Sequence, residues 1–300
     1  MALFIVLIHV TCTMGDDLYF IDAHSQVDHK IAPLDKVIFI MKQSGVSHTI
    51  LSARGKLKGK ALLSLASQYP DQITPAIRTK GKLYQIESSV YYKNLEQQVA
   101  SGRFGAMTEI LLYHAKKGNI APEYEVYPQD NRVQAALKYA VENRWPFVIH
   151  IEFGSLSGQT RAGFMEQLEK LLSQYPGHPF VLAHMGQLGY VDCRRLIENH
   201  KNLHFHTAWT NPAAIETSNQ PWVNIFNGKH ITPDWSNLFI QYPDRFIFAL
   251  DNVFAAQWTA SLYEKQMEYW KEGLAELPIE VAHLIAHGNA ERLWNIPPKD

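Results

Sequence analysis

The sequence predicts an α/β protein folded as a closed (β/α)8 barrel, in a single domain that spans residues 16–300. Eight short apolar runs alternate with longer segments of helical pattern after Gly15, which is the order of a parallel sheet with helical crossovers. No linker, charge block or internal repeat divides the 300 residues, and barrels of about 250 residues commonly form one domain. An open doubly wound sheet is the alternative, but no glycine-rich phosphate-binding motif follows any run.

The expected strands are nearly continuous in apolar residues, as strands buried on both faces should be. They cover residues 18–24, 46–52, 72–77, 105–112, 146–151, 179–184, 202–207 and 245–251. The expected helices lie near residues 34–44, 57–69, 89–101, 129–144, 162–175, 190–199, 230–241 and 256–275. The aromatic-rich segment 221–235 is left open as a lid, a dimer contact or a covered loop.

The composition predicts a globular chain that does not bind nucleic acid. Hydrophobic residues make up 46% of the chain, and 28 basic against 29 acidic side chains leave a net charge of -1. A nucleic-acid partner is therefore not expected. Two cysteines are too few for a disulfide framework or a cysteine zinc site. The 14 histidines direct attention to metal or acid–base chemistry.

Residues 1–15 form an apolar segment without Lys or Arg. It is too short to cross a bilayer as a helix, so no membrane span is expected. An apolar centre followed by small residues fits a signal peptide, which would make the mature protein periplasmic or secreted. A buried terminal strand or an upstream mis-start fits equally and would leave the protein cytoplasmic.

Polar residues at the ends of the apolar runs predict a metal site. The chemistry of a barrel sits at the carboxyl ends of its strands, where side chains and loops converge. In the first run Asp22, His24 and Gln26 alternate and are expected to share the inward face. The other strand-end candidates are Glu109, His150, His184 and Asp251. A lone strand-end histidine is more often structural, but candidates from five strands favour one shared site for a divalent ion.

Five sequence segments, spread over nearly the whole chain, carry a likeness to a known family. They are FIDAHSQ (20–26), TEILLYH (108–114), VIHIE (148–152), VLAHMG (181–186) with ALDN (249–252), and GNAERLW (288–294). Together they resemble the amidohydrolase superfamily, in its amidohydrolase-related branch of TIM-barrel metal-dependent hydrolases and decarboxylases.

The resemblance implies a role for each matching residue. His24 matches the first metal-binding histidine of the family, and His150 matches the strand-five ligand. His184 matches the strand-six histidine. Asp251 matches the strand-eight aspartate that binds metal and handles a proton. Glu109 resembles the acidic residue on strand four of many members.

Two departures from the family pattern concern the metal. Gln26 stands where the pattern has its second histidine. Because Gln offers only a neutral carbonyl oxygen, Gln26 is expected either to ligate the metal weakly or to hydrogen-bond beside it. No strand-four lysine is evident for a bridging carbamate, so one ion is expected, zinc first and manganese as the alternative.

The expected mechanism uses a water activated by the metal. A divalent ion held by His24, His150 and a carboxylate oxygen would lower the pKa of bound water from 15.7 towards about 7. Asp251 would accept the proton and return it to the leaving group. His184 would orient the substrate carbonyl or stabilise the charge on its oxygen.

Residues in the loops after the strands are the substrate candidates. Arg54 and Arg78 follow the second and third runs, where each would reach a substrate carboxylate or phosphate. His114 is placed in the loop after Glu109, facing the substrate, and Trp209 is expected to form a wall. His204 and His206 of the seventh run are interpreted as structural.

The expected function is that of a metal-dependent hydrolase acting on a small cyclic ester or amide. A metal-dependent decarboxylase on the same scaffold is the first alternative. A degenerate barrel that only binds a ligand is the second, because of the His-to-Gln departure at position 26. The sequence does not decide whether the protein forms a homo-oligomer.

Overall fold

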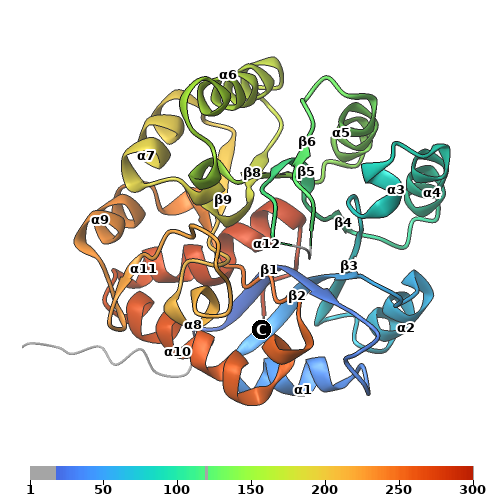
Figure 1. Cartoon of the computed structure of the whole chain (residues 1–300). Helices are drawn as coiled ribbons and strands as arrows, with labels where there is room; N and C mark the ends of the chain where they lie inside the picture. The colour runs from blue at the N-terminus through green and yellow to red at the C-terminus, as the bar shows by residue number, and fades with distance from the viewer. Residues whose placement is uncertain (1–17, 119–120, 300) are drawn as a thin grey trace, which may run out of the picture.

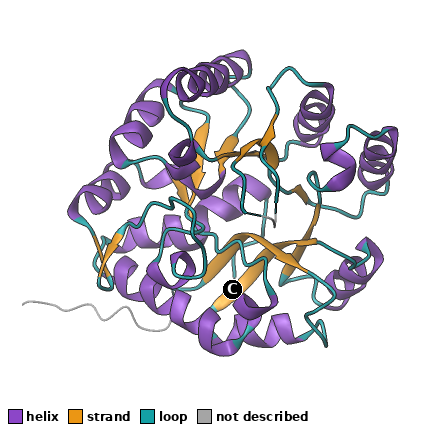
Figure 2. Cartoon of the chain, in the orientation of Figure 1, coloured by secondary structure: helices purple, strands orange, loops and turns teal. Residues whose placement is uncertain are grey.

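The computed structural model describes residues 18–118 and 121–299, so the signal-peptide interpretation of residues 1–15 falls outside the described residues. Figures 1 and 2 show the strands at the centre with helices around them. The barrel strands are β1 (Phe20–Val27), β2 (Val46–Ala53), β3 (Ile73–Ile77), β4 (Ala106–Met107), β5 (Ile110–His114), β7 (Phe147–Ile151), β8 (Phe180–Leu182), β9 (Leu203–His206) and β12 (Phe246–Ile247). They form two parallel arrays, β1-β2-β3-β4 and β12-β9-β8-β7-β5.

Backbone hydrogen bonds close these two arrays into a barrel. After β12 the chain stays extended beside β1, where the Asp251 N–H donates to the His24 carbonyl at 2.7 Å and the Gln26 N–H to the Asn252 carbonyl at 2.9 Å. On the other side, β4 and β5 are consecutive parts of one strand, with Glu109 between them. The predicted closed (β/α)8 barrel is confirmed.

Eight of the helices correspond to the eight predicted ones. They are α1 (Lys36–Gln43), α2 (Gly59–Gln68), α4 (Ser89–Ala100), α5 (Asn131–Asn143), α6 (Gly158–Gln174), α7 (Tyr190–Asn199), α9 (Pro233–Gln241) and α10 (Ala260–Ala275). The predicted start of α9 at residue 230 is wrong, because residues 230–231 pair with residues 226–227 in the hairpin of β10 (Phe226–Asn227) and β11 (His230–Ile231). The start of α6 is four residues earlier than predicted.

Other elements of the structure were not predicted. They are β6 (Tyr124–Glu125), α3 (Lys82–Gln85), α8 (Pro212–Ile215), α11 (Ile279–His283) and α12 (Asn289–Trp294). The family-like segment 288–294 is therefore helical and supplies apolar side chains to the core enclosed by the strands. No helix among the described residues is both long and apolar enough to cross a membrane.

A bulge in β1 sets which of its side chains reach the barrel interior. The residues on either side of Asp22 belong to the apolar core enclosed by the strands, and the register with β2 shifts between Asp22 and Ser25. Because a bulge changes which alternate residues face inward, His24 and Gln26 reach the interior but Asp22 does not. The expectation for Asp22 is wrong: its buried carboxylate accepts hydrogen bonds from the Ser25 hydroxyl at 2.5 Å and the Leu250 N–H at 2.9 Å.

Candidate metal centre

The histidine and carboxylate candidates come together in the mouth of the barrel. They are His24 of β1, Glu109 between β4 and β5, His150 of β7, His184 after β8, and Asp251 after β12. All are buried. Within the described residues their side chains form two groups suited to a metal ion, Glu109 with His150 and His184, and Glu109 with His24 and Asp251. The five residues that the sequence predicted to share one site therefore do lie together in the structure.

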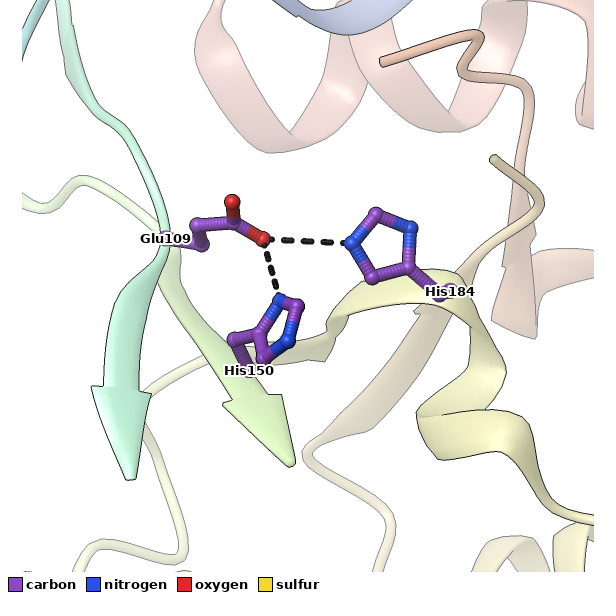
Figure 3. A group of neighbouring side chains, drawn as sticks. All are labelled: Glu109, His150 and His184. Atoms are coloured by element: carbon purple, nitrogen blue, oxygen red, sulfur yellow. Dashed lines mark hydrogen bonds and ion pairs between the residues drawn. The ribbon is translucent and has the colours of Figure 1, made fainter. Parts of the chain in front are cut away.

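Glu109 is shared by the two groups, and its two oxygens face different partners. Its Oε2 lies 2.9 Å from His150 Nδ1 and 3.3 Å from His184 Nε2, as Figure 3 shows. Its Oε1 lies 3.8 Å from His24 Nε2 and forms an ion pair with the Lys80 ammonium group. The carboxylate thus joins the β7 and β8 side of the site to the β1 and β3 side.

Asp251 is held at both carboxylate oxygens. Oδ1 accepts a hydrogen bond from Gln26 Nε2 at 3.0 Å and lies 3.2 Å from His24 Nε2. Oδ2 accepts one from the Trp209 indole N–H at 3.2 Å and lies 3.7 Å from His184 Nε2. Burial alone would raise the pKa of Asp251, but His24 and His184 hold it well below its usual range. The carboxylate is therefore ionised and fixed in direction.

Three residues of the site have left-handed backbone conformations. The φ angles are 54° at His184, 60° at Trp209 and 46° at Asp251. Each conformation costs a non-glycine residue on the order of 1 kcal/mol or more, and such strain concentrates at functional sites. Each of these residues lies within four residues of the end of a barrel strand, so the turn re-aims a side chain into the mouth.

Gln26 bridges Asp251 to Arg78. Its Nε2 donates to Asp251, and its Oε1 accepts a hydrogen bond of 2.5 Å from Arg78. The two partners fix the orientation of the amide, because a guanidinium group only donates and a carboxylate only accepts. Since its only good ligand atom is occupied by Arg78, the arrangement favours the hydrogen-bonding alternative for Gln26 over metal ligation.

Lys80 is a largely buried residue of the site that sequence reasoning missed. Its side chain is 14% exposed and pairs with Glu109. Burial, together with repulsion from Arg78, lowers the pKa of Lys80 to about 7, although Asp251 opposes the shift. A signal was present, because Lys80 lies two residues after Arg78 and alternate residues of an extended chain face the same side.

Glu152 is a second residue that sequence reasoning missed, and it contacts the ring nitrogen of His150 that does not face Glu109. Its Oε1 lies 3.2 Å from His150 Nε2 and 3.0 Å from the Lys117 ammonium, and its Oε2 accepts the Ala115 N–H at 2.7 Å. Burial would raise the pKa of Glu152, but His150 and Lys117 hold it well below its usual range. The spacing of two residues between His150 and Glu152 was the signal.

The donor set fits a divalent ion. Burial lowers the pKa of His150, so the ring is neutral and carries one N–H. It therefore cannot donate to Glu109 and Glu152 at once, and one ring nitrogen keeps a lone pair that a metal ion can accept. His24 Nε2 is also buried without a hydrogen bond. Imidazole nitrogens with carboxylate oxygens are ligands that suit zinc and manganese.

Four of the five candidate ligands, Glu109, His150, His184 and Asp251, line a cavity of about 700 Å³. All four substrate candidates, Arg54, Arg78, His114 and Trp209, line this cavity. Among its described lining residues are five Lys or Arg and three Asp or Glu side chains. Both arginines hydrogen-bond to neutral partners, Arg78 to the Gln26 oxygen and Arg54 to the Val253 carbonyl. The cavity therefore presents uncompensated positive charge to a ligand.

The remaining substrate candidates differ in detail from the expectation. His114 is the last residue of β5 and not a loop residue, and its ring stacks on His150 with 5.6 Å between centroids. Burial and the neighbouring His150 lower the pKa of His114 to about 4. Trp209 both lines the cavity and stacks on Trp222, with 5.2 Å between centroids.

The segment 221–235, whose role the sequence did not decide, contributes one residue to the site. Trp222 lines the cavity, and its ring lies 5.1 Å from the His184 ring. The rest of the segment forms the hairpin and the first turn of α9, where Trp235 is buried in the core. Only the start of the segment covers the site.

The two histidines of β9 hold backbone groups. His206 Nδ1 accepts a hydrogen bond from the His184 N–H at 3.2 Å, and its ring stacks on His24. His204 Nδ1 lies 3.4 Å from the Phe180 carbonyl. His206 thus positions the strained turn at His184.

Comparisons with known proteins agree with this geometry. A family model described as "Amidohydrolase" matches residues 95–296. No curated protein matches the chain.

Solved structures with the same fold cover most of the chain at low sequence identity. A putative 2-pyrone-4,6-dicarboxylic acid hydrolase from Pseudomonas putida is 13% identical, with a TM-score of 0.61 over 94% of this chain and 100% of that one. The 4-oxalomesaconate hydratase from Rhodopseudomonas palustris is 15% identical, with a TM-score of 0.57 over 92% and 96% of the two chains. An amidohydrolase from Burkholderia multivorans with bound zinc is 12% identical, with a TM-score of 0.52 over 93% and 100%.

Proposed function

The chain belongs to the amidohydrolase family, and from this premise we propose that it is a metal-dependent hydrolase acting on a small cyclic ester or amide. The observation that carries the proposal is the pair of histidine and carboxylate groups sharing Glu109, which lines the cavity. The family and the neighbouring structures, a hydrolase and a hydratase among them, support an enzyme of the hydrolase or lyase type.

The residues that would hold the ion are Glu109, His150 and His184, with His24 and Asp251 beside them. A bound divalent ion would supply a Lewis acid that lowers the pKa of water. Zinc is our first choice, supported by the zinc in the Burkholderia multivorans neighbour, and manganese is the alternative. His184 is assigned to this ligand set, and not to the substrate carbonyl, because its Nε2 lies 3.3 Å from Glu109 Oε2.

Asp251 is proposed to move the proton of the reaction. The carboxylate is ionised, faces the cavity and is oriented by Gln26 and Trp209. It would accept a proton from water in the cavity and return it to the leaving group. Trp222 and Trp209, stacked on each other, would exclude bulk water from one side of the reacting atoms.

The metal requirement is tested by elemental analysis of the purified protein. We expect about one zinc or manganese ion per chain, lost in His150→Ala because His150 belongs to a ligand group. His230→Ala is the matched control, since His230 is exposed on the surface. If neither the wild-type protein nor the His230→Ala control takes up an ion from zinc or manganese solution, the metal-dependent function is wrong. The proposal of a degenerate ligand-binding barrel then replaces it.

An anionic group on the substrate is proposed to bind at Arg54 and Arg78. Burial, with Arg54 nearby, lowers the pKa of Arg78 to about 10, which still leaves it charged at neutral pH. We expect isophthalate, a ring with two carboxylates, to bind in calorimetry and Arg78→Met to weaken it roughly tenfold or more, the value of one charged hydrogen bond. The exposed Arg103→Met serves as control. Equal affinity in the three proteins would remove Arg78 from the substrate site.

Decarboxylation is the second candidate, favoured by the positive charge of the same cavity. A substrate carboxylate on an activated carbon would be attracted there and lost as carbon dioxide. Screening lactones, amides and aromatic carboxylates with product analysis separates the two reactions, because only one of them releases carbon dioxide.

A further inference from the structure

We propose that Lys80 serves as a built-in cation at the Glu109 carboxylate, taking the place of a second metal ion and limiting the site to one. The ion then lies on the Oε2 side of Glu109, with His150 and His184. This inference rests on the proposed metal-dependent function and assigns the stoichiometry of its metal site.

The two oxygens of Glu109 face two different groups of candidate metal ligands. Figure 3 shows Oε2 directed at His150 and His184, with the other oxygen turned away from them. That other oxygen, Oε1, lies 3.8 Å from His24 Nε2, and Glu109 forms the second group suited to a metal with His24 and Asp251. A carboxylate placed between two such groups has the arrangement needed to bridge two cations.

Only one of the two positions is open to a metal ion, because Lys80 already occupies the other. The Lys80 ammonium is in contact with Oε1, and the pair is almost entirely out of solvent. Asp251 lies close enough to add a second favourable charge. A divalent ion bound by His24, Asp251 and Oε1 would meet this ammonium directly, and two cations at contact distance in a buried site repel strongly.

The surroundings hold Lys80 in this position. Arg78, two residues earlier, is tied to Gln26, which is tied in turn to Asp251. Lys80 follows the same strand end, where the attraction of its ammonium to Glu109 and Asp251 opposes the repulsion from the neighbouring arginines and Lys117. On the Oε2 side the nearby Lys117 pairs with Glu152, which also contacts His150 Nε2, and not with Glu109.

Metal stoichiometry tests the proposal without any assay of activity. Wild type, Lys80→Met, Lys80→Gln and Lys80→Arg are stripped with a chelator, checked for folding by circular dichroism, and titrated with zinc by calorimetry and elemental analysis. We expect one ion per chain in wild type and Lys80→Arg, and two in Lys80→Met. Lys80→Gln keeps a hydrogen bond to Glu109 without the charge, so it covers the case in which Lys80→Met does not fold, and it is also expected to bind two.

A double variant locates the second ion. Adding His24→Ala to Lys80→Met or Lys80→Gln should return the stoichiometry to one, because His24 belongs only to the Oε1 group. Two ions in wild type, or one ion of unchanged affinity in both neutral variants, overturns the role of Lys80 and leaves the metal-dependent function intact. No ion in wild type but one in the neutral variants supports Lys80 as the resident cation and overturns metal dependence of the natural protein. No ion in any of the proteins overturns both.

Discussion

Glu109→Gln is expected to abolish stoichiometric metal binding, weakening zinc affinity by at least about 100-fold. The substitution removes the one charged ligand that both candidate groups share. Loss of even an indirect metal contact typically costs 10–100-fold, so loss of a direct carboxylate ligand should cost more. Equilibrium dialysis against zinc measures the effect. His114→Ala is the matched control, because His114 lines the cavity but belongs to neither group.

The stability of the Glu109 variant must be separated from its metal affinity. Glu109→Gln leaves the Lys80 ammonium buried without its carboxylate, and breaking a buried ion pair costs about 3–5 kcal/mol. Adding Lys80→Met removes the unpaired charge and should recover most of this loss in urea unfolding, without restoring the ion. A double variant that binds zinc as tightly as wild type would show that Glu109 is not a ligand.

Gly186→Ala is expected to destabilise the protein by about 2–4 kcal/mol, because it adds backbone strain to overpacking. Gly186 has a φ of +65°, and an added Cβ would lie 2.6 Å from Leu182 Cδ2 and 3.2 Å from Phe153 Cδ2. The turn carries His184 two residues earlier, so the site should suffer as well. Urea denaturation of the metal-free protein measures the change in the free energy of unfolding.

The same substitution at Gly163 should have the opposite effect on the free energy of unfolding. Gly163 lies inside α6, and an added Cβ meets no atom within 4 Å. Alanine in a helix interior is favoured over glycine by about 0.5–1 kcal/mol, so Gly163→Ala is expected to stabilise the protein. Equal effects of the two alanines would contradict the packing argument at Gly186.

The strand-end pattern predicted which side chains gather at the candidate metal centre, because the pattern depends only on order along the chain. Wherever an apolar run ends in a barrel, the next polar side chain lies in the mouth, so His150 and Asp251 were found without coordinates. The bulge in β1 was not predictable, because it depends on pairing with β2 and leaves no mark in the alternation of Asp22 and His24.

Contacts between side chains were the least predictable part of the candidate site. Gln26 was placed near the mouth and Lys80 was missed, because a sequence does not say where an amide will point or which carboxylate an ammonium will contact. The C-terminal helices α11 and α12 were missed for another reason. They join through a π-helical turn at Leu284–Gly288, which disturbs the 3.6-residue period on which helix prediction depends.

The seam between β1 and the chain after β12 joins residues 227 positions apart, since Asp251 donates its N–H to the His24 carbonyl. Contacts of such long range are costly to form during folding and tend to be completed late. The site therefore does not exist until the last strand has docked on the first. An ion bound by Glu109, His150 and His184 would stabilise the finished barrel by mass action. A nascent chain lacking its final fifty residues would have neither Asp251 nor a closed wall.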